Sequence, residues 1–222
     1  LKAAGMNGLV LDLRFNPGGL LSEAIRVSDL FVRDGDMVST EGRATPKRTW
    51  RAKAKGTLIQ DGFPVAVLVN RFSASASEIV SACLQDHEIA AVVGERTWGK
   101  GSVQNVIEME GGRSALKLTT AGYQRPSGKN IHRQEGAKDE DEWGVKPSEG
   151  YELRFSPVEI AELDSHFRQQ SILGINAPDE APAENNYVDR QLAKAIEYIG
   201  EKLPAQETTD DAQPEEAVTA DG

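Results

Sequence analysis

The sequence predicts an α/β fold, and two patterns carry that prediction. Short, uninterrupted apolar runs at residues 65–69 and 89–93 have the composition of strands that are buried on both faces of a parallel sheet. The first run is followed by residues 75–85, which have the apolar spacing of a helix, and the second by a glycine-rich loop at residues 94–101. Strands that alternate with helices in this way are typical of α/β proteins.

Residues in the N-terminal part predict a further strand, a helix and an edge ribbon. Residues 9–13 form another apolar run, which we interpret as a buried strand, and residues 19–31 form the helix that follows it. Residues 37–58 alternate polar and apolar side chains and include six basic residues. We expect a β-ribbon or a loop there, at the edge of the sheet, where lysines discourage aggregation.

Residues in the C-terminal half predict a hairpin and two helices. Residues 103–109 and 114–120 flank a Gly-Gly pair, which favours a tight turn between two strands. Ser156 and Pro157 have the character of a helix start, because proline is well accommodated in the first helical turn. A last helix is expected over residues 187–203, where apolar residues recur at helical spacing.

The chain divides into three expected parts. Residues 1–155 form the core, and residues 156–203 form a C-terminal helical segment with a Pro- and Ala-rich linker at residues 177–186. Residues 204–222 contain acidic side chains but no Lys or Arg, so we expect a disordered acidic tail. The 222 residues, 39% of them hydrophobic, suffice for one substantial core. The formal net charge of −10 argues against nonspecific binding to nucleic acid.

Ser75 lies where the strand at residues 65–69 turns into a helix. Backbone N–H groups at the start of a helix lack intrahelical acceptors, so such a turn can supply both a nucleophile and the donors that stabilise an oxyanion. The alternative is structural: Ser75 caps the helix, and Glu78 completes a capping box. On this stretch alone both interpretations stay open.

The glycine-rich loop carries Lys100 between two glycines, which allow a backbone to approach another segment closely. We expect Trp98 and Val103 to remove part of the water around the amine, because desolvation lowers the pKa of a lysine and favours the neutral form that acts as a base. Gln104 lies four residues on, a spacing that helps to orient the amine only if the segment is helical. A solvated surface lysine is the alternative.

Several segments together resemble a known family. The segments around Ser75 and Lys100 are similar to the two catalytic blocks of the carboxy-terminal processing peptidases, also called tail-specific proteases, which are S41 serine peptidases. Further matches lie in three strings: residues 12–20, 118–123 and 125–129. All the blocks occur in the family's order between residues 8 and 147, so the resemblance is far more specific than a single short motif.

The resemblance implies a serine endopeptidase with a Ser-Lys dyad that cleaves protein substrates near their C-termini. It makes Ser75 the nucleophile and Lys100 the general base. Gln104 would hold the lysine amine, and Glu78 would support the site. The two-residue dyad would transfer a proton from the serine to the lysine and later to the leaving amine.

The resemblance also implies an oxyanion hole and a particular core. The donors would be the backbone N–H of Ala76 and one from the turn at Gly18 and Gly19, of which Gly18 is preferred. The family's core is crotonase-like (ClpP-like) and consists of stacked strand–strand–helix units. We expect an extended substrate to add as a strand beside the sheet. No cofactor, metal or nucleic acid is implied, and a homo-oligomer stays open.

Family members usually carry a secretion signal, a helical region and a PDZ domain upstream of these blocks. The chain starts at Leu1 with none of them, so we interpret it as a protease-domain fragment that lacks the upstream PDZ domain. No apolar stretch is long enough to span a bilayer. The resemblance implies a periplasmic or otherwise extracytoplasmic location in the cell envelope.

Other catalytic arrangements fit the sequence less well. His87 follows Ser75 by twelve residues on one predicted helix, or about 18 Å, which is too far for a base. His132 lies in a polar loop and stays open as a site residue. No cluster of His, Cys and Asp has metal-ligand spacing. The single cysteine, Cys83, is on the apolar side of its helix and is expected in the core.

Two functions of other classes remain as alternatives. One is a non-catalytic binding relative that keeps the fold, and the other is a crotonase-like acyl-CoA enzyme, whose oxyanion hole also lies at a helix start. Neither needs a serine paired with a lysine, so the combination of Ser75 and Lys100 favours the peptidase.

Overall fold

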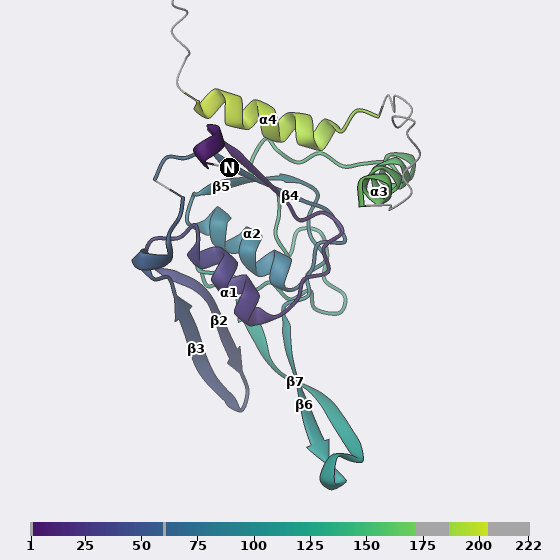
Figure 1. The fold of residues 1–222 in the computed structure, drawn as a ribbon. Coiled ribbons are helices and arrows are strands. Elements are labelled where there is room, and N and C mark those ends of the chain that lie inside the picture. The colour runs from purple at the N-terminus through teal and green to yellow at the C-terminus, as the bar shows by residue number, and fades with distance from the viewer. Residues whose placement is uncertain (1, 60, 172–186, 204–222) are drawn as a thin grey trace, which may run out of the picture.

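A computed structural model describes residues 2–59, 61–171 and 187–203 of the protein (Figure 1). The expected linker at residues 177–186 and the expected tail at residues 204–222 lie outside these described residues. Two β-sheets and the helices around them make up the fold. The chain is therefore an α/β protein, as the sequence predicts.

Three parallel strands form the central sheet. They run in the order β1 (Leu9–Asp12), β4 (Val65–Val69) and β5 (Ala90–Gly94). All residues of β4 and β5 are buried, which confirms the two predicted core strands. The strand β1 is less buried than expected: three of its residues are half-buried and Asp12 is exposed.

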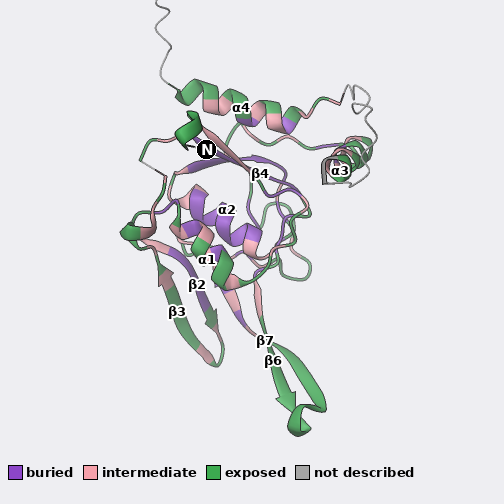
Figure 2. Cartoon of the chain, in the orientation of Figure 1, coloured by how far each residue is buried: buried purple, intermediate pink, exposed green. Residues whose placement is uncertain are grey.

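Helices cover both faces of this sheet (Figure 1). The helices α1 (Leu21–Asp29) and α2 (Ala76–Asp86) lie on one face, and α4 (Arg190–Lys202) lies across the other. Figure 2 shows that α2 is almost entirely buried, whereas α4 keeps an exposed outer side. The remaining long helix, α3 (Pro157–Ser171), begins at the proline that the sequence indicated.

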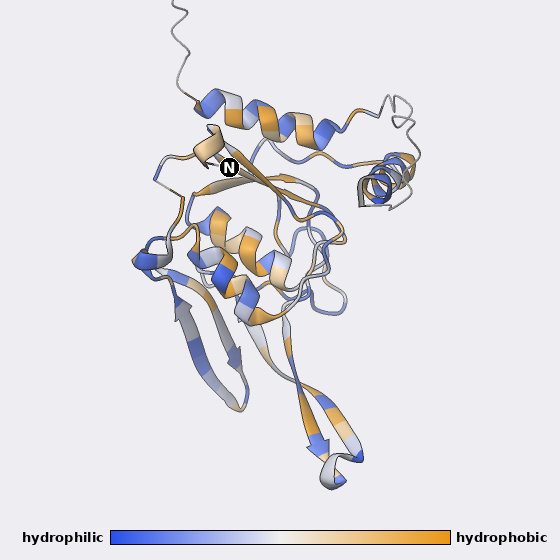
Figure 3. Cartoon of the chain, viewed as in Figure 1, coloured by the Kyte–Doolittle hydropathy of each residue, from blue (hydrophilic) through white to orange (hydrophobic). Residues whose placement is uncertain are grey.

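The two-sided cover explains why the apolar run in β4 is uninterrupted rather than alternating. Val65 and Val69 belong to the apolar cluster of α1 and α2, whereas Ala66 and Leu68 pack against Ala195 of α4. Both faces of the strand therefore need apolar side chains. The hydropathy colouring shows the same pattern, with apolar residues all along the central strands (Figure 3).

A second sheet is antiparallel and has the strand order β3-β2-β7-β6. Its strands are β2 (Asp36–Gly42), β3 (Thr45–Arg51), β6 (Ser102–Met109) and β7 (Ser114–Gln124). The predicted edge ribbon is thus the β2–β3 hairpin, and the predicted Gly-Gly hairpin is β6–β7. The tip of the β6–β7 hairpin projects away from the rest of the fold (Figure 1).

The predicted helices are present with slightly shorter ends. The helix expected at residues 19–31 is α1, and the one expected at residues 187–203 is α4. No helix within the described ranges is long and apolar enough to cross a membrane.

Candidate active site

Ser75 occupies a strained turn between β4 and α2. It is the N-cap residue of α2 and has φ 58° and ψ −115°, outside the regions that residues with a side chain normally adopt. Such a conformation costs about 1–3 kcal/mol and persists only where the surrounding structure holds it. In the α/β-hydrolases a nucleophilic serine is exposed on a sharp strand-to-helix turn of this kind.

The Glu78 carboxylate joins two segments: the turn at residues 70–75, here called the serine turn, and the loop at residues 94–101, here called the lysine loop. Its Oε2 accepts the backbone N–H groups of Ser75 and Lys100, each at 2.8 Å. Its Oε1 accepts the hydroxyl of Thr97 at 2.5 Å and the N–H of Gly99 at 2.7 Å. Two segments that lie far apart in the sequence therefore meet at one fully buried side chain.

The ionisation of Glu78 follows from these contacts. Burial raises the pKa of Glu78, and the four hydrogen bonds act in the opposite direction. The Thr97 hydroxyl accepts the N–H of Val145 at 2.8 Å, so its own proton is available to Glu78. All four groups are thus donors, and an ionised carboxylate is the acceptor that satisfies them.

Further backbone bonds fix the loop that carries Lys100. The N–H of Trp98 donates to the carbonyl of Ser73 at 3.0 Å, two residues before the serine of the turn. The carbonyls of the two glycines beside Lys100 accept the N–H groups of Arg133 and Tyr123, at 2.8 and 2.7 Å. The loop is held along its backbone, and its lysine side chain is exposed.

The two glycines beside Lys100 are required by close contacts. A Cβ at Gly99 would lie 2.7 Å from the Cβ of Arg133, and one at Gly101 would lie 2.3 Å from the backbone N of His132. Neither position has room for a side chain, as the sequence indicated.

The turn after β1 packs against the serine turn. A Cβ at Gly18 would lie 2.5 Å from the carbonyl oxygen of Ala74 and 2.6 Å from the N of Ala76. The carbonyl of Asn16 accepts the N–H of Ala74 at 3.0 Å and the hydroxyl of Ser77 at 3.1 Å. The two turns therefore form one continuous surface at the carboxyl ends of β1 and β4.

Two backbone N–H groups of this surface are free to bind an anion. Within the described ranges, the N–H groups of Ala76 and Gly19 have no hydrogen-bond partner. The N–H of Gly18 donates to Oδ1 of Asn16 at 2.9 Å. The arrangement can thus offer Ala76 and the Gly-Gly turn to a developing oxyanion, with Gly18 as the residue that permits the close approach.

The surroundings of Lys100 differ from the expectation. Trp98 is 59% exposed, Val103 is half-buried and Lys100 is exposed, so the expected burial of the lysine is not seen. Gln104 lies in the strand β6, which begins two residues after Lys100 and has an irregular register with β7 between Val103 and Gln104. A spacing of four residues would direct Gln104 towards the amine only in a helix, and this segment is not helical.

The remaining candidates divide as follows. Cys83 is fully buried in the core, as expected, and burial raises its pKa to about 12. His87 follows α2, and its Nε2 lies 2.8 Å from the carbonyl oxygen of Asp36. The backbone of His132 lies against Gly101, next to Lys100, and its Nδ1 is buried without a hydrogen-bond partner among the described residues.

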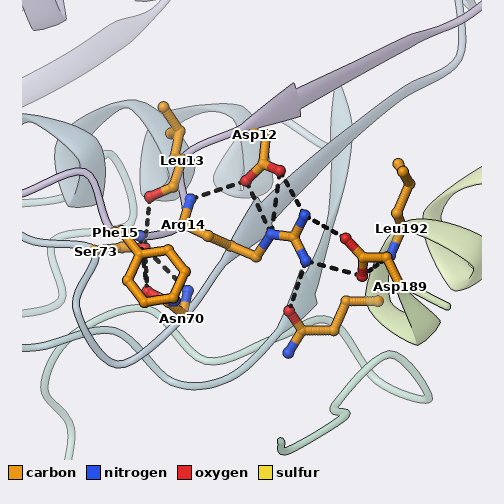
Figure 4. A network of polar contacts seen from close by, with 9 residues as sticks. Asp12, Leu13, Arg14, Phe15, Asn70, Ser73, Asp189 and Leu192 are labelled. Carbon is orange, nitrogen blue, oxygen red and sulfur yellow. Dashed lines mark hydrogen bonds and ion pairs between the residues drawn. The ribbon is translucent and has the colours of Figure 1, made fainter. Parts of the chain in front are cut away.

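Polar residues that the sequence did not single out support the turns. Oδ1 of Asn70 accepts the N–H groups of Phe15 and Phe72 at 3.0 and 3.1 Å. Ser73 donates its hydroxyl to the carbonyl of Leu13 at 2.8 Å (Figure 4). Asparagine and serine directly after a buried strand are typical turn residues, and that is the signal that could have found them.

The fold and the site define an α/β protein in which a serine turn and a lysine loop meet at a buried carboxylate. Residues 1–147 match the model of peptidase family S41, so the chain belongs to peptidase family S41.

Three relatives illustrate the similarity. The "Carboxy-terminal-processing protease" of Bartonella bacilliformis is 51% identical over 126 residues, which are 57% of this chain and 29% of that protein. The "Carboxy-terminal processing protease CtpA" of Bacillus subtilis is 36% identical over 154 residues, 69% of this chain and 30% of that protein. The solved "Photosystem II D1 C-terminal processing protease" is 34% identical, with a TM-score of 0.59 over 69% of this chain and 36% of that chain. The chain thus spans about a third of the length of these relatives.

Proposed function

We propose that this chain carries the catalytic site of a serine endopeptidase that cleaves protein substrates near their C-termini. The observation that supports it most is the Glu78 carboxylate, which accepts the N–H of Ser75 and the N–H of Lys100 at one oxygen. The shared acceptor brings the backbones of the two residues together. The names of the relatives supply the expected substrate, a protein C-terminus.

In this mechanism the neutral amine of Lys100 takes the proton of the Ser75 hydroxyl as the serine oxygen attacks the scissile carbonyl. The negative charge that develops on the carbonyl oxygen is stabilised by the N–H of Ala76 and an N–H of the turn at Gly18 and Gly19. The lysine ammonium then gives its proton to the leaving amine, and water hydrolyses the acyl-enzyme. Gln104 is assigned to orient the amine on the family resemblance.

The sheet offers a place for the substrate. The strand β6 is the outer strand of its sheet and begins two residues after Lys100, so its free edge leads away from the site. An extended peptide that paired with this edge would be read mainly through its backbone. An extracytoplasmic location belongs to the same proposal and comes from the family resemblance.

A serine-reactive fluorophosphonate probe tests the dyad on the 222-residue chain. We expect Ser75→Ala to abolish labelling and Lys100→Met to slow it by a factor of about 100 or more, because the serine loses its base. The matched controls are Ser114→Ala, at the tip of the β6–β7 hairpin, and Lys146→Met, an exposed lysine. Both should label like wild type.

Equal labelling of wild type, Ser75→Ala and Lys100→Met would contradict the proposal. It would favour a non-catalytic relative of the same fold or a crotonase-like acyl-CoA enzyme, neither of which needs this pair. Mass spectrometry of the labelled peptide identifies the modified serine directly.

A further inference from the structure

Arg14 connects the C-terminal helix to the loop that follows β1 (Figure 4). Its guanidinium bonds to both oxygens of Asp12, with Nη2 2.6 Å from Oδ2, and to both oxygens of Asp189, at 2.9 and 2.7 Å. Nη1 also donates to Oε1 of Gln191 at 3.2 Å. We term these four residues the Arg14 clamp.

The centre of the clamp is buried, although the side chain of Asp12 at its rim is 32% exposed, and the geometry of the clamp is specific. Arg14 is 5% exposed and Gln191 is fully buried. Burial acts to lower the pKa of Arg14, but the two carboxylates outweigh it and raise that pKa above its ordinary value. Paired planar groups of this kind fix direction as well as distance. A buried ion pair adds little to the free energy of unfolding, or lowers it, when compared with apolar side chains of similar volume. Stability alone therefore does not account for the Arg14 clamp.

The clamp is also part of the start of α4. Oδ1 of Asp189 accepts the N–H of Leu192 at 3.0 Å and so caps the helix. Nε2 of Gln191 donates to the carbonyl of Leu153 at 2.7 Å. The first turn of α4 therefore has a fixed position relative to Arg14, 175 residues away in the sequence from Asp189.

The chain leads directly from Arg14 to the serine turn. Phe15 has φ 58°, a strained value for a residue with a bulky side chain. The carbonyl of Asn16 then accepts the N–H of Ala74, and Gly18 lies against Ser75 and Ala76. Only three residues separate the clamped guanidinium from the glycine that touches the serine.

We propose that Asp189 is a positioning residue of the proposed active site: through Arg14 it holds the turn of residues 15–19 in the place where that turn serves as part of the oxyanion hole. This inference depends on the proposed peptidase function. It assigns a role in the site to α4, a helix that supplies no residue to the serine turn or the lysine loop.

Two substitutions separate this role from helix capping. Asp189→Ser keeps an N-cap oxygen for Leu192, because serine caps helices about as well as aspartate, but it is too short to reach Arg14. Asp189→Asn keeps the cap and one oxygen for Arg14 but removes the charge. Arg190→Ala is the matched control, since it removes a neighbouring ion pair with Glu159 of α3 on the surface.

The measurement is the saturation kinetics of fluorophosphonate labelling, well below the melting temperature of each variant. We expect the maximal labelling rate to fall about 10- to 100-fold in Asp189→Ser and less in Asp189→Asn, because a small displacement of a reacting group has effects of this size. The apparent probe affinity should change less than about twofold, since the lost interaction acts only in the transition state. Arg190→Ala should behave as wild type.

Hydrogen exchange supplies a second readout that needs no activity. Asp189→Ser should accelerate exchange in a peptide that covers residues 15–19, and Arg190→Ala should not. An unchanged maximal labelling rate and unchanged exchange in Asp189→Ser would overturn the positioning role. If the probe did not label the wild-type chain, the proposed peptidase function would be overturned. Faster exchange in Asp189→Ser would in that case still support the contact between α4 and the turn of residues 15–19.

Discussion

At the scale of single residues, Glu78 shows that capping and catalytic support need not compete. The sequence left open whether Ser75 caps a helix or presents a nucleophile. The Glu78 carboxylate accepts the Ser75 N–H, which is the contact that a capping box requires of its acidic residue. The same carboxylate accepts the N–H of Lys100. One buried side chain therefore caps the N-terminus of α2 and joins the two segments of the proposed dyad.

The segments that meet at the proposed site could be predicted from sequence further than the surroundings of their side chains. Ser75, Lys100 and the Gly-Gly turn lie in strings with a recognisable order, and those strings meet in the structure. The exposure of Lys100 could not be predicted, because it depends on which segments pack over the loop. The strand that carries Gln104 was predicted as part of the hairpin at residues 103–120, but the place of the Gln104 side chain relative to the Lys100 amine could not be predicted from it.

Gly18 offers a prediction at the scale of one residue. Gly18→Ala should lower the free energy of unfolding by about 1–3 kcal/mol, because φ is +93° there and the new Cβ would lie 2.9 Å from the Cβ of Ser75. The control is Gly19→Ala, where a Cβ would meet no atom within 4 Å. Urea unfolding of both variants checks it. Equal stability of the two would show that the turn can move away from Ser75.

At the scale of elements, the central strands and helices were the most predictable part of the molecule. The strands β4 and β5 were found because helices cover both faces of their sheet and so demand continuous apolar runs. The helix α4 was also found from its periodicity, but the surface that it covers was not. Periodicity shows that a helix has an apolar face; it does not show that Ala66 and Leu68, more than a hundred residues earlier, lie beneath it.

The end of α2 carries a second contact between distant elements. Asp86 accepts three hydrogen bonds from the Arg125 guanidinium, the shortest at 2.6 Å between Nη2 and Oδ1, and one from the N–H of Ser127 at 3.0 Å. The side chains of Asp86 and Arg125 are only 12% and 10% exposed. Burial acts to raise the pKa of Asp86, but these bonds outweigh it and hold that pKa below its usual value.

A pH dependence follows from this lowered pKa. The folded state binds the Asp86 proton less readily than the unfolded state, so the stabilisation is complete above pH values near 4 and is lost as the pH falls further. Asp86→Asn should therefore cost about 1–3 kcal/mol in urea unfolding at pH 7 and clearly less at pH 3. Asp34→Asn, which removes an exposed carboxylate 3.6 Å from Arg51, should change little at either pH. A cost of Asp86→Asn that is equal at both pH values would rule out the charge as its cause.

At the scale of the whole molecule, the C-terminal helix belongs to the same core as the S41 region. The family match ends at residue 147, and α4 begins at Arg190. Nevertheless α4 packs on the central sheet together with Tyr151, and Asp189 at its start binds Arg14. Removal of this helix would expose Leu68 and Val93 as well as the clamp. The scaffold of the fold therefore extends well beyond the matched region.

The layer that α4 forms can be tested with two neighbouring residues. Ala195 is fully buried against Leu68 and Val93, whereas Ile196 is 57% exposed on the outer side of the same helix. Ala195→Asp should lower the free energy of unfolding by about 3 kcal/mol or more, because it places an unpaired carboxylate on an apolar face. Ile196→Asp introduces the same charged residue, loses a few tenths of a kcal/mol less helix propensity than Ala195→Asp, and should cost less than about 1 kcal/mol. If the two variants unfolded at the same urea concentration, α4 would not be packed on the sheet in solution. The Arg14 clamp would then have no fixed helix to hold it, so this comparison tests the architecture on which the role of Asp189 depends.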